Sequence, residues 1–285
     1  MPVIVTDLSV NYGDCCALAL PGTYEFMPGD ITAVLGNNGA GKTTFIKALL
    51  GEVHYSGSVD LGDLGNHIGV QFQSNSYNPL MKVREMIRLV SGSAAGRVLD
   101  EGDKFAIRPL LNKQIGTLSG GEKQRLTLYL VLLHDEQGYV FDELTSGLDF
   151  PSRQTLMALV RERTKNATVF ITTHYFEEVE NWASHVLILD RGRSIFNGTP
   201  SHLFDLYPHY SLIQYSASDK ADFPSDAVLT IPWDSTKRAV MTRDTEDQGR
   251  KSATLSNAGV TFEVQPRCLY SAYTLLMSGQ NGSLS

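Results

Sequence analysis

Residues 36–43 read Gly-Asn-Asn-Gly-Ala-Gly-Lys-Thr and match the phosphate-loop pattern G-x-x-x-x-G-K-[ST] at every fixed position. The apolar run Ile31–Leu35 before them predicts a buried strand, and Thr43–Leu50 after them has helical spacing. Glycines let backbone N–H groups approach phosphate oxygens, and a helix start adds unpaired N–H groups and a positive dipole end. The alternative, a glycine-rich turn with an incidental lysine, is disfavoured by the strand–loop–helix context. The pattern therefore predicts a nucleotide-phosphate site.

A second segment places acidic residues at the end of another apolar run. Tyr139–Phe141 predicts a short buried strand, and Asp142 and Glu143 follow it directly. A carboxylate there can reach a Mg²⁺ ion held by Thr43, while Lys42 neutralises the β- and γ-phosphates. Glu143 would then act as the base that orients and activates a water molecule. Taken alone, this acidic pair would be interpreted as two solvated acids, and the phosphate loop reverses that preference.

Short apolar runs alternate with helical segments over most of the chain. This alternation predicts an α/β fold with a mainly parallel sheet covered by helices on both faces. Ligands of such sheets bind beyond the carboxyl ends of the strands, where the phosphate loop and the acidic pair are expected. The expected strands are Val3–Val10, Ile31–Leu35, Tyr139–Phe141, Thr168–Thr172 and Val186–Leu189, and the expected helices include Thr43–Leu50, Pro151–Thr164 and Ser201–Leu206.

Two regions depart from the alternation. Met81–Val90 and Lys104–Leu111 are predicted helices, which form a helical insert at about residues 74–117. The character of the chain changes again beyond about residue 210, so we divide it into a domain of residues 1–215 and a small α+β accessory domain of residues 216–285. The accessory domain is expected to contain the strands Ala227–Ile231, Arg238–Thr242 and Val260–Val264, the polar stretch Arg243–Ser252 between them and a closing helix Leu269–Met277.

Composition restricts the possible partners and environment. A net charge of −7 and a pI near 5.5 argue against a nucleic-acid binder that works through a broad basic face. Cys15, Cys16 and Cys268 have neither a disulfide framework nor metal-ligand spacing, and they fit free thiols in a reducing cytosol. The N-terminus does not have the pattern of a signal peptide. The longest nearly apolar run, Leu126–Leu133, is far shorter than the about 20 residues of a membrane helix.

Further segments resemble a known family. Leu118–Arg125 (LSGGEKQR) resembles the LSGGQ-type signature of ATP-binding cassette (ABC) ATPases, with Glu at its fifth position. Asp142-Glu143 followed by Ser146–Asp149 resembles the Walker B motif and D-loop, and His174 matches the switch histidine. The order of these motifs is that of the family, and the resemblance covers about residues 3–205. It implies a P-loop NTPase core with a mainly parallel sheet, a small antiparallel β subdomain and a reduced helical insert.

The resemblance also implies a role for each motif. One chain has two phosphate-binding helix ends, at the phosphate loop and at Ser119–Gly121, although its own nucleotide needs only the first. In the family, each ATP of a head-to-tail dimer lies between the phosphate loop of one copy and the signature of the other, and hydrolysis switches the dimer. The expected nucleotide contacts are Tyr12, Gly36, Asn37, Asn38, Gly39, Ala40, Gly41, Lys42, Thr43, Thr44, Ser119, Gly120, Gly121 and Asp149. The expected catalytic residues are Glu143, His174 and Gln73, and the expected Mg²⁺ ligands are Thr43, Gln73 and Asp142.

Three of these assignments have alternatives. Gln73 is preferred over Gln71 as the Q-loop glutamine because Glu85 then lies twelve residues later, as in relatives with a Val-Arg-Glu helix start. Tyr12 resembles the aromatic residue that stacks on adenine, and an ordinary turn tyrosine after a strand is the alternative. The role of His174 depends on its place in the motif order, because a lone histidine is usually structural.

The resemblance implies an ATP-binding and ATP-hydrolysing subunit, with Mg²⁺, that powers a membrane transporter. The expected partners are a second cassette (a second copy or a paralogue) and a separate permease, at the cytoplasmic face of the cell membrane; no nucleic acid is expected. The ABC-2-type exporter branch is favoured, although Leu269 begins no acidic Leu-Glu-Asp-like motif. One alternative is a soluble, non-transport ABC ATPase acting on ribosomes or nucleic acid, and another is a nucleotide-sensing scaffold without turnover. The single acidic cassette argues against the former, and the intact Glu143 and His174 argue against the latter.

Overall fold

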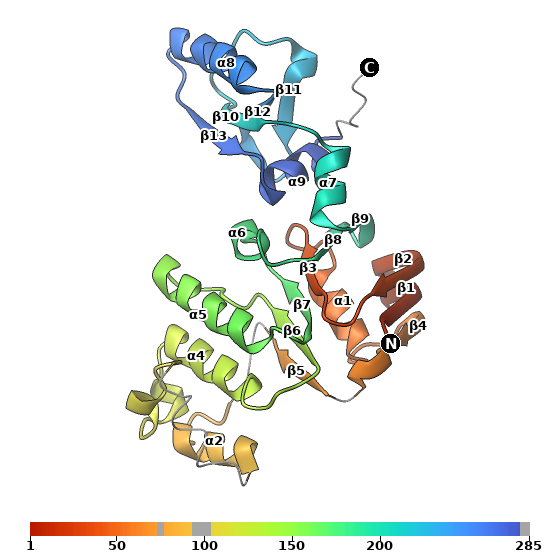
Figure 1. Ribbon diagram of the computed structural model, residues 1–285, viewed down its shortest axis with the longest axis vertical. Helices are drawn as coiled ribbons and strands as arrows, with labels where there is room; N and C mark the ends of the chain where they lie inside the picture. Colours follow the sequence, from red (N-terminus) through yellow and green to blue (C-terminus); the bar gives the residue numbers. More distant parts are fainter. Residues whose placement is uncertain (66, 73–76, 93–103, 280–285) are drawn as a thin grey trace. The chain divides into compact units, whose positions relative to one another are not determined.

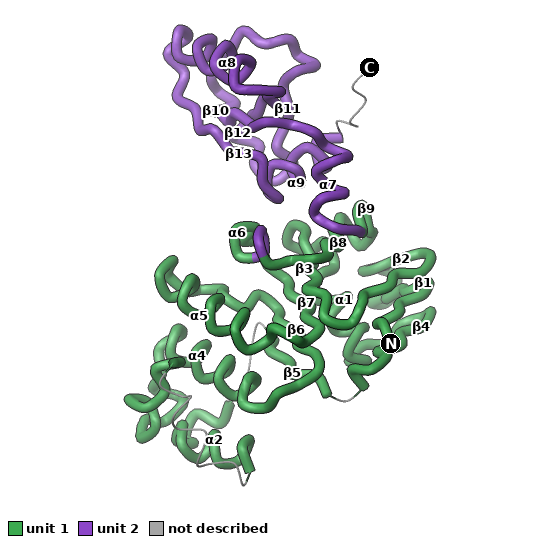
Figure 2. Tube along the Cα trace, in the orientation of Figure 1, with its two compact units in different colours: residues 1–178, 182–197 green, residues 179–181, 198–285 purple. Residues whose placement is uncertain are grey.

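The computed structural model describes residues 1–65, 67–72, 77–92 and 104–279 (Figure 1). The chain forms two compact units, which Figure 2 shows in different colours. The first unit is Met1–Glu178 with Trp182–Asn197, and the second is Val179–Asn181 with Gly198–Ser285. The second unit therefore includes residues 179–181 and 198–215, which were predicted to belong to the first domain.

The sheet of the first unit combines parallel and antiparallel strands. Among the described residues, nine strands form it in the order β4-β1-β2-β9-β8-β3-β7-β6-β5. β3 pairs in parallel with β7 and β8, β6 pairs in parallel with β5 and β7, and β1 pairs antiparallel with β2 and β4. The predicted α/β fold with a mainly parallel sheet is confirmed. The strands are β1 (Val3–Tyr12), β2 (Cys15–Phe26), β3 (Ile31–Leu35), β4 (Ser56–Asp60), β5 (Ile68–Gln71), β6 (Gly138–Asp142), β7 (Thr168–Thr172), β8 (His185–Asp190) and β9 (Arg193–Gly198).

Helices cover this sheet on both sides. Figure 1 shows α4 and α5 along one side of β5, β6 and β7, with α1 on the side of β1 and β2. The core beside α1 is rich in aromatic rings: the Phe26 and Phe170 centroids lie 5.1 Å apart, and Phe45 of α1 packs beside both. Burying one such ring stabilises the fold by about 1.5–3 kcal/mol. The helices are α1 (Lys42–Leu49), α2 (Val83–Ser91), α4 (Gly120–Val131), α5 (Phe150–Arg163) and α6 (Phe176–Val179).

One predicted helix of the insert is wrong. Residues 104–111 form turns and a short 3-10 helix, Arg108–Leu110, in place of a continuous α-helix. Ala106 has φ 53°, and Pro109 removes a backbone donor, so neither residue supports a regular helix there. The other predicted helix of the insert corresponds to α2, and residues 74–76 and 93–103 of the insert lie outside the described residues.

The second unit has its own antiparallel sheet, in the order β11-β12-β10-β13. Neighbouring residues of β10 point to opposite faces: Leu212 packs with Leu275 of α9, and Ile213 packs with Leu255 of α8. The three strands and the closing helix predicted here are present, whereas β10 and α8 were not predicted. The elements are α7 (Pro200–Leu206), β10 (Ser211–Ser216), β11 (Val228–Ile231), β12 (Asp234–Thr242), α8 (Thr245–Asn257), β13 (Phe262–Pro266) and α9 (Leu269–Met277). None of the helices within the described ranges combines the length and hydropathy needed to cross a bilayer.

Candidate active site

The phosphate loop joins β3 to α1 through glycines whose backbone conformations few other residues adopt. Gly36, Gly39 and Gly41 all have positive φ angles, of 147°, 80° and 105°. A Cβ atom on Gly36 would lie 2.4 Å from the Leu189 carbonyl oxygen, and one on Gly41 would lie 3.2 Å from that of Ala17. Glycine is therefore required both for the backbone conformation and for the close approach of neighbouring strands.

Lys42 is the first residue of α1 and is buried inside this loop. Its Nζ donates hydrogen bonds to the carbonyl oxygens of Gly36, at 2.8 Å, and Asn37, at 3.2 Å. Burial lowers the pKa of Lys42, while the nearby carboxylates Glu143 and Asp142 oppose this shift. A cation removed from water in this way is suited to an anionic ligand.

The neighbouring strand ends connect Thr43 to the acidic pair. Thr43 Oγ1 donates to Oδ2 of Asp142 at 3.0 Å, which joins α1 to the end of β6. Asp142 and Thr172 are partners in the parallel register of β6 and β7, and Thr172 Oγ1 donates to Asp142 Oδ1 at 2.5 Å. The same hydroxyl accepts from the backbone N–H of Glu143 at 3.0 Å. Thr172 therefore holds both acidic residues, a role that no sequence motif indicated.

Glu143 and His174 are brought together where β6 and β7 end. Glu143 has φ 52°, in the left-handed region, which turns the chain sharply after the strand. Its Oε1 lies 3.9 Å from Nδ1 of His174. The side chain of Glu143 is 15% exposed and that of His174 is 45% exposed, so the pair lies where solvent meets the strand ends. The geometry allows both groups to contact one molecule, from which one could accept a proton and to which the other could donate one.

The signature segment forms an open helix tip. Ser119 caps α4 by accepting from the Glu122 N–H at 3.2 Å, and the Glu122 side chain accepts in return from the Ser119 N–H at 2.8 Å. Ser119 and Gly120 are exposed, and a Cβ atom on Gly120 would meet no atom within 4 Å. Because these residues are exposed, the start of α4 is open to a second molecule.

Contacts also tie α4 to the loop after Glu143. Gln124 Nε2 donates to the carbonyl oxygen of Leu144, and a Cβ atom on Gly121 would lie 3.5 Å from Leu148. Asp149, at the end of this loop, caps α5 by accepting from the Ser152 N–H at 2.8 Å, a bond that lowers the pKa of Asp149. The Asp149 carboxylate thus has a capping function besides its expected contact with nucleotide.

The remaining expected site residues lie at the end of β1, in the phosphate loop and in α1, or outside the described residues. Tyr12 ends β1 and is 52% exposed, and Thr44 lies in the first turn of α1. Asn38 and Gly39 are exposed in the phosphate loop, and Ala40 is buried there. Gln73 lies outside the described residues. Gln71 ends β5, is fully buried, and its Nε2 donates to the carbonyl oxygen of Phe72 at 2.7 Å and lies 3.5 Å from that of Asp142.

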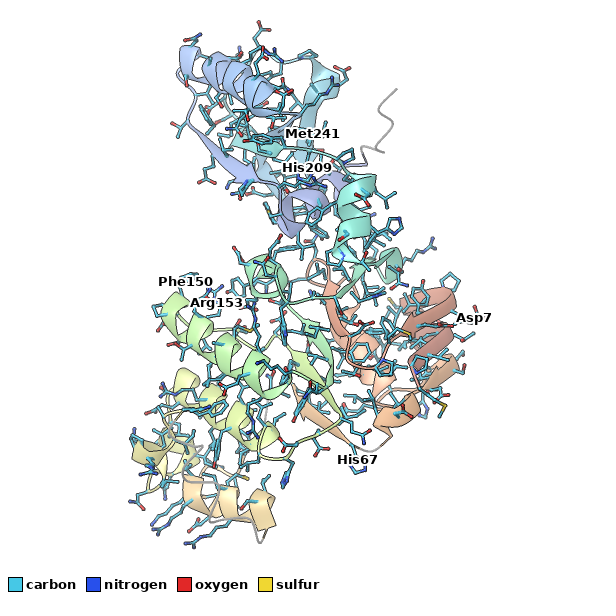
Figure 3. All side chains as sticks on the ribbon, viewed as in Figure 1. Asp7, His67, Phe150, Arg153, His209 and Met241 are labelled. Carbon is cyan, nitrogen blue, oxygen red and sulfur yellow. The ribbon has the colours of Figure 1, made fainter. Side chains whose placement is uncertain are left out.

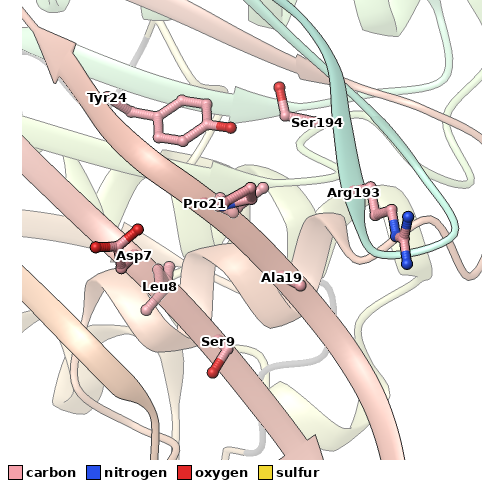
Figure 4. A pocket seen from close by; sticks show the side chains of 9 residues that line it. Asp7, Leu8, Ser9, Ala19, Pro21, Tyr24, Arg193 and Ser194 are labelled. Carbon is pink, nitrogen blue, oxygen red and sulfur yellow. The ribbon is translucent and has the colours of Figure 1, made fainter.

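A separate groove lies between β1, β2 and β9, and Figure 4 shows it from close by. β2 and β9 share a single parallel pair, Ala19 with Arg193, so the strands diverge beyond it. The groove has a volume of about 420 Å³. Its lining comprises Asp7, Leu8, Ser9, Ala19, Leu20, Pro21, Tyr24, Arg193 and Ser194, and no expected site residue is among them.

Comparisons with known proteins agree with this geometry. The family described as "ABC transporter" matches residues 22–146. "Nod factor export ATP-binding protein I" of Rhizobium etli is 31% identical over 240 residues, which cover 77% of this chain and 75% of that protein. The protein of the same name from Burkholderia thailandensis is 33% identical, covering 77% and 78%. A solved structure titled "Structure of ATP binding subunit of ABC transporter" shares the fold, with a TM-score of 0.65 and 23% identity over 72% of this chain and 92% of the other. The chain therefore belongs to the ABC transporter family of ATP-binding proteins, and it is an ATPase.

Proposed function

We propose that this ATPase powers export through a separate transmembrane permease, at the cytoplasmic face of the membrane. Support comes from the relatives described above, which are named as export ATP-binding proteins. Their similarity to this chain extends over more than two thirds of both proteins. The observation that carries the ATPase part of the proposal is the cluster of Lys42, Thr43, Asp142 and Glu143 at adjoining strand ends. The transported substrate would be recognised by the permease.

Two groups in this cluster fit a magnesium ion. The Thr43 hydroxyl and the Asp142 carboxylate are hard oxygen ligands 3.0 Å apart, beside the loop proposed to hold the phosphates. Thr43 and Asp142 would hold the ion together with Gln73, which lies outside the described residues. When bound, Mg²⁺ supplies electrostatic neutralisation of the phosphate oxygens.

Different residues of the protein would bind the nucleotide and act on the attacking water. Lys42 and the N–H groups of Gly39–Thr44 would bind the β- and γ-phosphates, and Tyr12 would stack on the adenine. Glu143 would accept a proton from the attacking water at a carboxylate oxygen, and His174 would contact that water or the γ-phosphate. The 3.9 Å separation of Glu143 Oε1 and His174 Nδ1 supports a shared site for that water.

Two copies would complete each site. Ser119, Gly120 and Asp149 of one copy would face the γ-phosphate bound by the phosphate loop of the other, as a homodimer or with a paralogue. The tip of α4 supports this arrangement, because Ser119 and Gly120 are exposed at the positive end of the helix. ATP would hold the copies together, and loss of the γ-phosphate would release them.

Isolation of the chain from its native cells tests the transport role. Tagged wild-type chain and the Glu143→Gln variant are purified in mild detergent with ATP, and the stoichiometry of each associated protein is measured. We expect a polytopic membrane protein in a fixed ratio to two copies of the chain, enriched by Glu143→Gln. Recovery with ribosomes, and absence from solubilised membrane complexes, would contradict the transport role and favour the soluble alternative.

A further inference from the structure

One buried carboxylate joins the two loops that carry the proposed hydrolytic residues. Glu178 lies in α6, four residues after His174, and is 4% exposed. Thr145 Oγ1 donates to Glu178 Oε1, and Thr173 Oγ1 donates to Glu178 Oε2 at 2.9 Å. Thr145 belongs to the loop after Glu143, and Thr173 belongs to the loop that contains His174. Each oxygen of the Glu178 carboxylate therefore holds one of these loops.

Thr173 fixes the backbone on both sides of His174. Its Oγ1 accepts a hydrogen bond from the Tyr175 N–H at 2.9 Å while donating to Glu178. A threonine hydroxyl has a single proton, so its direction is decided by the acceptor it faces. Because Glu178 accepts the hydrogen bond from this hydroxyl, a lone pair of Thr173 Oγ1 remains to accept from the Tyr175 N–H. Glu178 thereby determines the turn that presents His174.

Arg153 provides a second connection to the same histidine. Arg153 Nε lies 3.8 Å from Glu178 Oε1, and the guanidinium carbon lies 3.7 Å from the centroid of the Tyr175 ring. The Tyr175 and His174 ring centroids are 4.1 Å apart. Arg153 and Phe150 both lie on α5, the helix that follows Asp149, as Figure 3 shows. A continuous series of contacts therefore runs from α5 to His174.

Packing alone does not account for a carboxylate at this position. Burial raises the pKa of Glu178, and the hydrogen bonds from Thr145 and Thr173 with the nearby Arg153 oppose this rise. An apolar residue of similar size would avoid this desolvation cost. A carboxylate, in contrast, accepts from two hydroxyl groups in different loops, which fixes the distance between those loops.

We propose that Glu178 is a positioning residue of the ATPase, which sets His174 relative to Glu143 by holding Thr145 and Thr173 on its two oxygens. The proposal rests on the hydrolytic roles proposed above for Glu143 and His174. Glu178 acts by placing His174, so its removal should slow turnover without weakening ATP binding.

The isosteric substitution Glu178→Gln tests this proposal in the full chain. Glutamine has one acceptor oxygen, so one of the two threonine hydroxyls loses its acceptor. We expect kcat for ATP hydrolysis to fall at least about tenfold, since displacements of about 1 Å have effects of that size. KM for ATP should stay within about twofold, because the phosphate-loop contacts are untouched. Glu177→Gln is the matched control: it makes the same change at the adjacent, exposed residue and should leave both constants unchanged.

The effect of Glu178→Gln on kcat in a variant that lacks His174 distinguishes a positioning role from a merely structural one. In a His174→Ala background, Glu178→Gln should change the remaining kcat by less than about twofold, because both act through one group. A full tenfold additional loss in that background, or an increase in KM in place of the fall in kcat, would overturn the proposal. Wild-type kcat in Glu178→Gln would overturn it as well.

A second pair of variants decides the matter if Glu178→Gln does not fold. Thr173→Val removes the hydroxyl and should reproduce the fall in kcat, whereas Thr173→Ser keeps it and should retain wild-type kcat. Equal values of kcat for Thr173→Val and Thr173→Ser would overturn the proposal.

The hydrolytic roles proposed for Glu143 and His174 are tested separately. If Glu143→Gln and His174→Ala keep wild-type turnover, these hydrolytic roles are wrong. If both variants lose turnover while Glu178→Gln and Thr173→Val keep wild-type kcat, only the positioning role is wrong.

Discussion

The hydroxyl of Thr172 donates to Oδ1 of Asp142 at 2.5 Å while accepting from the backbone N–H of Glu143 at 3.0 Å. One side chain on β7 thus orients both acidic residues at the end of β6. The contact depends on the parallel register that places Thr172 opposite Asp142. A change at this one hydroxyl should therefore affect the two carboxylates that are proposed to hold Mg²⁺ and to activate the attacking water.

Thr172→Val should lower kcat at least about tenfold, because Asp142 then loses one of its two hydroxyl donors and the backbone of Glu143 loses a hydrogen bond to the same side chain. Unfolding free energy should fall by about 1–3 kcal/mol, since the Glu143 N–H and the buried Asp142 each lose a partner. Steady-state ATPase assays and denaturant titration measure the two effects. Thr168→Val, at the start of the same strand, removes a hydroxyl that accepts from the Gly29 N–H and should reduce stability alone. An unchanged kcat in Thr172→Val would show that this hydroxyl does not organise the site.

Lys42→Met should weaken ATP binding at least about tenfold, because a charged hydrogen bond to phosphate is lost. The lowered pKa means that the folded protein binds this proton less tightly than the unfolded chain does. The charged form of Lys42 is therefore less favourable in the folded protein than the neutral form, so wild-type stability without ATP should rise as the pH increases from the lowered pKa toward 10.5. Calorimetric titration and thermal unfolding test both statements. Lys47→Met, later in α1, is the control and should retain ATP binding.

His209 in the second unit should make that unit sensitive to acid. Its Nε2 lies 2.6 Å from Ser271 Oγ and its Nδ1 lies 2.7 Å from the Tyr207 carbonyl oxygen, and burial lowers its pKa below the usual 6.5. A lowered pKa means that the stability contributed by neutral His209 is present above pH 6.5 and is lost as the pH falls through the folded-state value.

Hydrogen exchange of α7 and α9, corrected for intrinsic rates, measures this effect between about pH 8 and about pH 5. Wild-type protection should decline toward acid more steeply than that of His209→Gln. His202→Gln, on the exposed side of α7, should retain the wild-type pH dependence. Identical profiles for the wild type and His209→Gln would exclude His209 as the titrating group.

The elements nearest the site could be predicted because their signals are local. Ile31–Leu35 and Thr168–Thr172 are short runs of apolar residues and threonine, and both correspond to strands, β3 and β7. Parallel strands end at the same edge, so the meeting of Glu143 with His174 follows from strand order as well as from motifs. The phosphate loop could also be predicted from a local signal, because its backbone conformation favours glycine at fixed positions.

The second unit shows where local signals are insufficient. α8 has a single buried residue, Leu255, so it has no apolar stripe to reveal a helix. Only its cap, in which Asp244 accepts from the Asp247 N–H at 2.7 Å, marks its start. β10 coincides with the predicted domain boundary, and its partners, β12 and β13, are distant in sequence.

Residues that act by holding others could not be predicted. Thr172 and Glu178 belong to no motif found in the sequence, and their contacts join segments that lie 30 and 33 residues apart in the chain. Such contacts depend on strand register and on the turn after Glu143. Neither is determined by the residues of one segment alone.

Dimerisation of the Glu143→Gln variant tests the central claim that two copies enclose ATP. Sedimentation velocity is measured with saturating ATP for Glu143→Gln alone and for Glu143→Gln combined with Ser119→Arg, after calorimetry has confirmed ATP binding by both. We expect a stable dimer with almost no turnover for the single variant. We expect a monomer for the double variant, because the long arginine side chain would block the exposed helix tip. A Glu143→Gln chain that binds ATP yet stays monomeric, or hydrolyses ATP at the wild-type rate, would contradict enclosure of ATP by two copies.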